Sequence, residues 1–181
     1  MSLLNASLTA QLSELLKKMV SKIEIISYVD NSETSQKVKS LLEEVSQQSD
    51  KISISEVNNN EISNVKRKPS FELRRKLDNP VNGESTVSIS FAGLPLGHEF
   101  SSLVLALLQV SGYAPKISDE QRNAILKLGS HNVTTYMSVT CLNCPEVVQS
   151  LNTISIINPK IQHTVVEGSA FREEVDKLGV M

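Results

Sequence analysis

Residues 133–157 read VTTYMSVTCLNCPEVVQSLNTISII, with two cysteines near the middle of the run. The residues before the cysteines, 133–139, are rich in β-branched and aromatic side chains, which is typical of a strand. The residues after them, 145–157, carry apolar side chains at helical spacing. We expect four of these side chains to face inward: Val147, Val148, Leu151 and Ile154. The run therefore predicts a strand that leads through a C-x-x-C turn directly into a helix.

This position gives Cys141 and Cys144 a specific chemistry. The N–H groups and the macrodipole at a helix N-terminus favour an anion, so the pKa of the Cys141 thiol should be lowered toward neutrality. Cys144 follows one turn later, which puts the two Cα atoms about 5.5 Å apart, within disulfide range. We expect Cys141 to attack the disulfide of a partner, and Cys144 to attack the mixed disulfide and release the reduced partner. Pro145 suits the first turn of a helix, where its missing N–H is not needed.

The cysteine pair allows two other interpretations. A C-x-x-C can be half of a zinc site, but the chain has no second C-x-x-C and no pair of histidines at ligand spacing. Its three histidines, His98, His131 and His163, are far apart in the sequence, and we expect them in helix-cap, loop or strand positions. The pair could also be buried and inert. The strand, C-x-x-C and helix in succession favour redox chemistry over both, and we expect no metal site.

Predicted strands and helices alternate along the rest of the chain, which indicates an α/β fold. The expected strands are residues 23–29, 52–57, 70–73, 86–91, 133–139 and 161–166. The expected helices are residues 1–20, 32–49, 99–110, 145–157 and 169–178, with one more after a capping pattern at Ser118. In the last of them Leu178 should lie on the apolar face. A turn at residues 79–83 should separate the third strand from the fourth, and the polar residues 58–61 should form a loop.

The order strand, helix, strand occurs twice, and the second occurrence is offset by about 110 residues at each step, which indicates an internal duplication. Its elements begin at Ile23, Ser32 and Lys51, and again at Val133, Cys141 and Lys160. We expect residues 1–113 to form the first unit and residues 114–181 to begin the second. The counterpart of the cysteines in the first unit is residues 31–34, NSET, which can cap a helix but carries no thiol.

Composition excludes several classes of protein. The 181 residues are 40% hydrophobic with a net charge of −2, and the basic clusters at residues 66–68 and 74–76 are short and lack stacking aromatics, so we expect no nucleic-acid surface. No segment is long and apolar enough to span a bilayer, and charged residues interrupt any signal-peptide core near the N-terminus. Two cysteines in one motif do not make a secreted disulfide scaffold. We therefore expect a cytoplasmic protein.

Two long motifs resemble a known family. Residues 135–152, TYMSVTCLNCPEVVQSLN, and residues 91–108, FAGLPLGHEFSSLVLALL, are similar to the N-terminal domain of the F subunit of alkyl hydroperoxide reductase, a flavin-dependent peroxiredoxin reductase. Residues 67–71 and 158–164 add to the similarity, which runs over nearly the whole chain. The resemblance implies two fused thioredoxin-like or glutaredoxin-like folds, of which only the second keeps cysteines. That agrees with the duplication inferred from the offset.

The resemblance also implies a function and partners. Electrons would pass from NADH to FAD and to a cysteine pair in the flavoprotein body, then to Cys141 and Cys144, and finally to the disulfide of the peroxiredoxin, which is the C subunit of alkyl hydroperoxide reductase. Glu99 matches a carboxylate of the first fold that acts as acid and base near the cysteines. Beside apolar Phe100 and Leu103, its pKa should be raised. Considered without the resemblance, Glu99 is more simply a charge that suits a helix N-terminus. A homodimer is implied for the full-length protein only.

The chain departs from the family pattern in three ways. Leu142 stands where the family usually has histidine, which predicts a less acidic Cys141 thiol and an altered redox potential. The family continues beyond Met181 with a Gly-Val-Pro segment whose cis proline packs against the cysteines, so the second fold is expected to be incomplete. No G-x-G-x-x-G fingerprint occurs, so FAD and NADH should bind elsewhere in the full-length protein and no cofactor in this chain.

Two alternatives stay open at this point. The chain could be a free-standing glutaredoxin-like carrier that another reductase supplies with electrons. It could also be a folded, inactive fragment that binds a peroxiredoxin or nothing, because the second fold is expected to lack its last strands.

Overall fold

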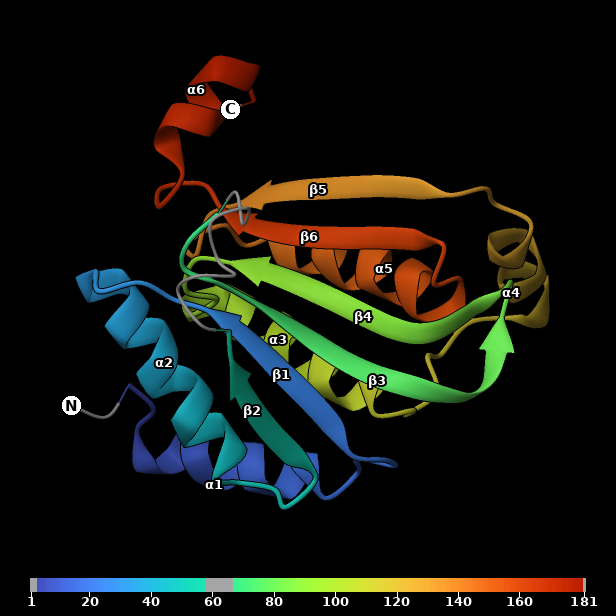
Figure 1. Cartoon of the computed structure of the whole chain (residues 1–181), viewed down its shortest axis with the longest axis horizontal. Coiled ribbons are helices and arrows are strands. Elements are labelled where there is room, and N and C mark those ends of the chain that lie inside the picture. The colour runs from blue at the N-terminus through green and yellow to red at the C-terminus, as the bar shows by residue number, and fades with distance from the viewer. Residues whose placement is uncertain (1–2, 58–66, 181) are drawn as a thin grey trace.

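Six strands form one mixed sheet in the order β2-β1-β3-β4-β6-β5 (Figure 1). The computed structural model describes residues 3–57 and 67–180, so the predicted loop at residues 58–61 lies outside the described residues. The strands are β1 (Ile23–Tyr28), β2 (Ile52–Glu56), β3 (Ser70–Val81), β4 (Glu84–Ala92), β5 (His131–Met137) and β6 (Ile161–Glu167). The predicted α/β class is confirmed.

Both halves of the chain contribute to this sheet. Strands β1 and β2 are parallel, as are β5 and β6, as expected for the two strand–helix–strand units. Strand β4 of the first half pairs in parallel with β6 of the second over three residues, Ser90–Ala92 against Thr164–Val166. The sheet therefore runs without a break from one half into the other, and the division after residue 113 stays a prediction.

The hairpin between β3 and β4 differs from the expectation. Residues 79–81 belong to β3, and only Asn82 and Gly83 form the turn. Both have positive φ, 51° and 88°, which a two-residue hairpin turn of this kind requires and which asparagine and glycine supply readily. The ladder is irregular between Lys76 and Val81, and that irregularity accommodates Pro80, which has no N–H to donate.

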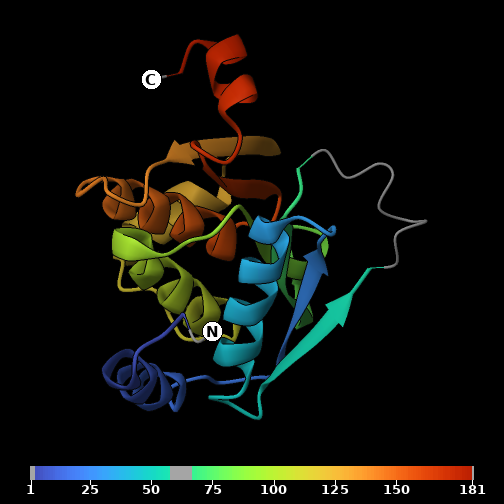
Figure 2. The ribbon, with the colours of Figure 1, turned by 90° about the vertical axis from the view of Figure 1, so that its left-hand side faces the viewer.

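The larger helices gather on one side of the sheet, as Figure 2 shows for α1, α3 and α5. The helices are α1 (Ala6–Leu16), α2 (Glu33–Ser46), α3 (Phe100–Val110), α4 (Asp119–Leu126), α5 (Cys144–Ile157) and α6 (Arg172–Leu178). A short 3₁₀ turn, Gly97–Glu99, precedes α3. Ser118 caps α4 in a capping box with Gln121, as predicted. None of the described helices is long and apolar enough to cross a membrane.

The core between the sheet and the helices is mostly aliphatic, because the chain has no tryptophan and few other aromatic residues. Phe71 of β3 and Phe91 of β4 stack with ring centroids 5.4 Å apart, and both are fully buried. Leu103 and Leu107 of α3 are buried in the same cluster. Two predictions of inward-facing residues were wrong: Val147 is 52% exposed and Leu178 is 56% exposed. Val148, which was also predicted to face inward, is fully buried.

Polar contacts join the two halves at both ends of the sheet. At one end the Asn82 side chain donates to Asn158 Oδ1 at 3.0 Å, and Asn158 donates in turn to the carbonyls of Ile125 and Leu128. At the other end Arg67 forms a two-pronged ion pair with Glu174 of α6, which also accepts a hydrogen bond from Tyr136 of β5 at 2.7 Å. These links hold the halves in one arrangement.

Candidate functional site

Cys141 and Cys144 form a disulfide between the end of β5 and the start of α5. Their Cα atoms lie 5.5 Å apart, the separation that the sequence predicted. Helix α5 begins at Cys144, one residue earlier than expected, and Pro145 lies in its first turn. Cys141 lies in the turn before the helix, where its N–H donates to the Ser138 carbonyl at 3.0 Å. The predicted strand, C-x-x-C turn and helix are all present.

The two sulfur atoms lie in different surroundings. Cys141 Sγ accepts a hydrogen bond from the backbone N–H of Cys144 at 3.1 Å, so the sulfur is aligned with the N-terminus of α5. Such a donor stabilises a thiolate when the pair is reduced. Cys144 packs against the hydrophobic core. Leu142, between the two cysteines in the sequence, is an apolar side chain that is 76% exposed. The geometry suits Cys141 as the attacking thiol and Cys144 as the resolving one.

Glu99 is fully buried at the end of the 3₁₀ turn that leads into α3. Neither oxygen of its carboxylate has a hydrogen-bond partner among the described residues. Burial raises the pKa of Glu99, and the nearby Ser102 hydroxyl opposes the shift. The direction is the one expected from the apolar neighbours Phe100 and Leu103. A carboxyl whose pKa is raised toward that of a thiol is better suited to exchange protons with it.

The structure brings the segment that carries Glu99 against the segment that carries the cysteines. The backbone N–H of His98 donates to the Val139 carbonyl at 3.1 Å, two residues before Cys141. Beside Glu99, the Gln149 side chain of α5 donates to the Ser102 hydroxyl of α3 at 3.2 Å. Contacts on both sides of Glu99 therefore join its segment to α5 and to residues 138–143, the turn between β5 and α5 that carries Cys141 (the redox turn).

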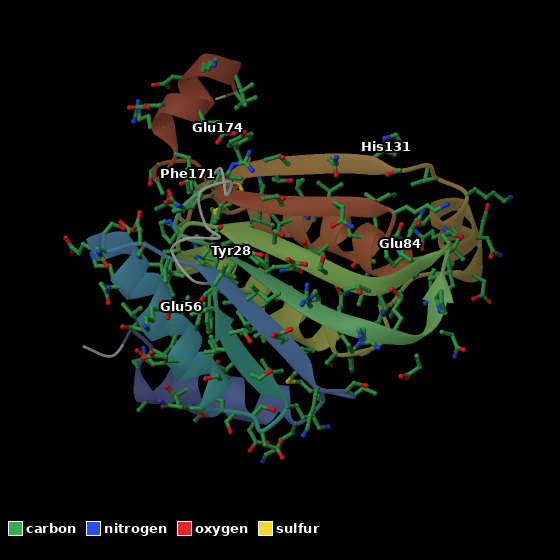
Figure 3. All side chains as sticks on the ribbon, viewed as in Figure 1. Tyr28, Glu56, Glu84, His131, Phe171 and Glu174 are labelled. Carbon is green, nitrogen blue, oxygen red and sulfur yellow. A yellow bond between two sulfur atoms is a disulfide. The ribbon has the colours of Figure 1, made fainter. Side chains whose placement is uncertain are left out.

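The three histidines occupy separate places. His98 is exposed in the 3₁₀ turn. His131 starts β5, whereas the cysteines follow the end of that strand. Figure 3 shows His131 at the opposite end of the sheet from Phe171 and Glu174. His163 is buried in β6. Over residues 3–57 and 67–180, no three His, Cys, Asp or Glu side chains are grouped as metal ligands.

His163 forms a buried network beneath α5. Its Nδ1 lies 2.7 Å from Asn152 Oδ1 of α5, and its Nε2 lies 2.9 Å from the Thr135 hydroxyl of β5. Because the amide oxygen can only accept, Nδ1 carries the hydrogen and the Thr135 hydroxyl donates to Nε2. Burial lowers the pKa of His163 to about 4, so the ring is neutral at pH 7. The network ties α5 to β5 and β6 on either side of the redox turn.

Sequence reasoning missed one contact of the site. Gly97 lies against Val139 with φ +61°, and a Cβ on Gly97 would meet the Val139 carbonyl oxygen at 2.5 Å. The sequence shows a glycine just before a predicted helix, which is an ordinary pattern. It carries no signal for the partner, because the two residues belong to different halves of the chain.

The chain matches known proteins by sequence, although no protein-family model matches it. Among curated proteins, the F subunit of alkyl hydroperoxide reductase from Staphylococcus aureus is 44% identical over 177 residues, which make up 97% of this chain and 32% of that protein. The protein of the same name from Staphylococcus epidermidis has the same identity and coverage. The chain therefore spans about a third of the length of the curated relatives it matches.

Solved structures also match the fold of the chain. The NTD_N/C domain of alkylhydroperoxide reductase AhpF from Enterococcus faecalis superposes with a TM-score of 0.84 at 28% identity, covering 98% of this chain and 86% of that one. A protein disulfide oxidoreductase from Aeropyrum pernix superposes with a TM-score of 0.79 at 20% identity, covering 98% of this chain and 80% of that one. At that identity the second match shows the fold alone. Together they confirm the thioredoxin-like fold.

Proposed function

Because the chain is homologous to the N-terminal region of the F subunit of alkyl hydroperoxide reductase, we propose that it is a thiol–disulfide electron carrier. It takes two electrons from a disulfide centre of a flavoprotein and passes them to the disulfide of a peroxiredoxin, the C subunit of the same reductase. The observation that carries the proposal is the Cys141–Cys144 disulfide at the start of α5. The carrier supports peroxide detoxification in the cytoplasm, which is a reducing compartment where close cysteine pairs serve in catalysis.

Transfer to the peroxiredoxin takes two exchange steps. The Cys141 thiolate attacks one sulfur of the partner disulfide, which forms a mixed disulfide and releases the other partner sulfur as a thiolate. The Cys144 thiolate then attacks Cys141 Sγ, restores the Cys141–Cys144 disulfide and releases the first partner sulfur. The partner gains two electrons and the carrier loses two. The hydrogen bond from the Cys144 N–H to Cys141 Sγ favours Cys141 as the first nucleophile.

We propose that Glu99 accepts and returns protons in these steps. Its carboxyl group is buried at the end of the turn that leads into α3, and desolvation raises its pKa. A carboxyl with a pKa closer to neutrality can accept the proton of a thiol and return one to a leaving thiolate within one cycle. An exposed glutamate keeps its ordinary pKa and is a poorer match for a thiol in proton transfer.

Regeneration reverses the exchange with a different partner. A dithiol of the flavoprotein body attacks the Cys141–Cys144 disulfide and returns both cysteines to thiols. The FAD and NADH that supply those electrons belong, in this proposal, to the remaining two thirds of the full-length relatives and not to the residues of this chain. When bound in that body, FAD would supply the two-electron chemistry that connects NADH to its disulfide centre.

The test is a thiol count. The protein is reduced with dithiothreitol, freed of it and mixed with the oxidised peroxiredoxin, and the thiols gained by the peroxiredoxin are counted. We expect two thiols per molecule, none with Cys141→Ser, and a trapped covalent complex with Cys144→Ser on a non-reducing gel. Absence of transfer by the wild-type chain would leave an inactive binding fragment. Re-reduction by glutathione as readily as by the flavoprotein body would support a free-standing glutaredoxin-like carrier.

A further inference from the structure

A very close backbone approach at the site joins Gly97 to Val139. A Cβ built on Gly97 would lie 2.5 Å from the Val139 carbonyl oxygen and 3.5 Å from the Val139 Cβ. The same carbonyl accepts the His98 N–H at 3.1 Å. Only glycine fits at position 97 unless the turn moves away from Val139.

Both sides of this contact belong to the redox machinery. Val139 lies two residues before Cys141, whose own N–H is bound by the Ser138 carbonyl. On the other side, Glu99 follows Gly97 by two residues and is fully buried. The chain between the contact and each functional group is therefore too short to absorb a displacement of the turn.

We propose that Gly97 is a positioning residue for thiol–disulfide exchange: its lack of a side chain lets the turn Gly97–Glu99 close on the Val139 carbonyl and fixes the Glu99 carboxylate relative to Cys141 and Cys144. The inference rests on the proposed function of the cysteine pair and of Glu99. It adds a residue that carries no reacting group and acts through the backbone of both segments.

The chain contains a matched control for this idea. Gly179 has φ +64°, nearly the same as the +61° of Gly97, but a Cβ at position 179 would meet no atom within 4 Å. Gly179→Ala therefore introduces only the conformational strain of alanine at positive φ. Gly97→Ala introduces that strain and the clash with Val139. The difference between the two variants isolates the contact.

The readout is the rate of thiol–disulfide exchange as a function of pH. Each reduced protein reacts with the disulfide reagent 5,5′-dithiobis(2-nitrobenzoate), and the initial release of thionitrobenzoate is followed from pH 4 to pH 9. We expect the wild-type profile to contain a limb that Glu99→Gln removes. In Gly97→Ala this limb should move to lower pH as water reaches the carboxylate, and the rate at pH 7 should fall roughly tenfold because the reacting groups are misplaced.

Gly179→Ala should keep the wild-type profile and show only a lower melting temperature. A profile for Gly97→Ala that matches the profile of Gly179→Ala would overturn the proposal, since the contact would then be structural only. A wild-type profile without a limb due to Glu99 would overturn it as well. Failure to reduce the peroxiredoxin is a separate result that overturns the proposed function, because the reagent needs no docking surface.

A second variant covers the case that Gly97→Ala does not fold. His98→Pro removes the N–H that binds Val139 and leaves Gly97 in place, and proline is tolerated in the first turn of a helix. Asp119→Pro is its control, since Asp119 is the first residue of α4 at the far end of the sheet (Figure 1). We expect the displaced limb in His98→Pro and the wild-type profile in Asp119→Pro. The same profile in both would contradict the positioning role.

Discussion

At the scale of single residues, the burial of Glu99 lowers the stability of the fold and also supports its proposed role in proton transfer. An ionised carboxylate that is buried without a partner destabilises the folded state. Because its pKa is raised, the contribution of Glu99 to stability should be most favourable below its unfolded pKa, where it is protonated in both states, and should be lost as pH rises through the folded pKa. A residue kept for stability alone would not show this pattern.

Glu99→Gln should therefore have opposite effects on stability and on exchange. We expect the free energy of unfolding at pH 7.5 to rise by about 1 kcal/mol, because the amide has no charge to desolvate. The rate of thiol–disulfide exchange at the same pH should fall at least tenfold. Urea unfolding and stopped-flow exchange measure the two quantities.

Glu146→Gln is the matched control for that prediction. Glu146 lies exposed in the first turn of α5, close to the cysteines in sequence but open to solvent. Its substitution should change stability by no more than about 0.5 kcal/mol and leave the pH profile unchanged. If Glu99→Gln lowered stability and left the exchange rate unaltered, the proton-transfer role would be wrong.

At the scale of elements, α6 depends on an ion pair made by a distant part of the chain. Arg67 and Glu174 are each only 17% exposed in their side chains, and two hydrogen bonds of 2.6 and 3.0 Å join them. Burial of one charge without the other is unfavourable. The pair therefore fixes α6 to the segment just before β3 and to Tyr136 of β5.

Arg67→Met should loosen α6 locally. We expect hydrogen exchange of residues 172–178 to become faster, equivalent to a loss of about 1–3 kcal/mol in local stability, while the amides of β3 and β4 keep their protection. Mass spectrometry of the exchanged peptides measures this. Arg172→Ala breaks only an exposed pair at 3.9 Å with Asp176 and should change nothing. Equal protection of α6 in both variants would contradict the anchoring role.

The elements also show which features the sequence could predict. Apolar periodicity and capping patterns predicted the six helices and six strands named above, because apolar spacing reflects which face is buried. Periodicity failed at Val147, since two adjacent valines both fit an apolar face and only packing selects Val148. The prediction ended the third strand at residue 73 and placed a turn at residues 79–83, whereas β3 continues to Val81, because it stays paired with β4 through Lys76 and again at Val81.

The site was predictable only in part, for the same reason. Cys141 and Cys144 lie close in sequence, so local spacing predicts their geometry. The contact of Gly97 with Val139 and the pair of Arg67 with Glu174 join residues from different halves of the chain. Such contacts depend on how β4 and β6 pair, and no local pattern encodes that pairing. The family resemblance supplied Glu99, which local reasoning alone had assigned to a helix N-terminus.

At the scale of the whole molecule, His163 should make stability depend on pH. Its pKa is about 4 when folded and about 6.5 when unfolded, so the unfolded state binds the proton more readily. The contribution of His163 to stability is full above pH 6.5 and falls as pH decreases from 6.5 to 4, by about 3 kcal/mol in total. Below pH 4 the imidazole is protonated in both states and adds no further slope.

His163→Gln should flatten that part of the stability curve. Urea unfolding at pH 7, 6, 5 and 4 measures the slope, and we expect most of the wild-type decline across this range to disappear. His131→Gln is the control, because His131 is exposed at the start of β5. A slope that survives in His163→Gln would assign the pH dependence to other groups.

The links at both ends of the sheet have a consequence for the kinetics of an encounter. Asn82 with Asn158, Arg67 with Glu174, and Gly97 with Val139 hold the two halves in one orientation before any partner arrives. A partner that meets the disulfide then orders little of this body, so association loses mainly rigid-body freedom and little internal entropy. Orientation at collision, and not closure of one half on the other, should set how often an encounter leads to exchange.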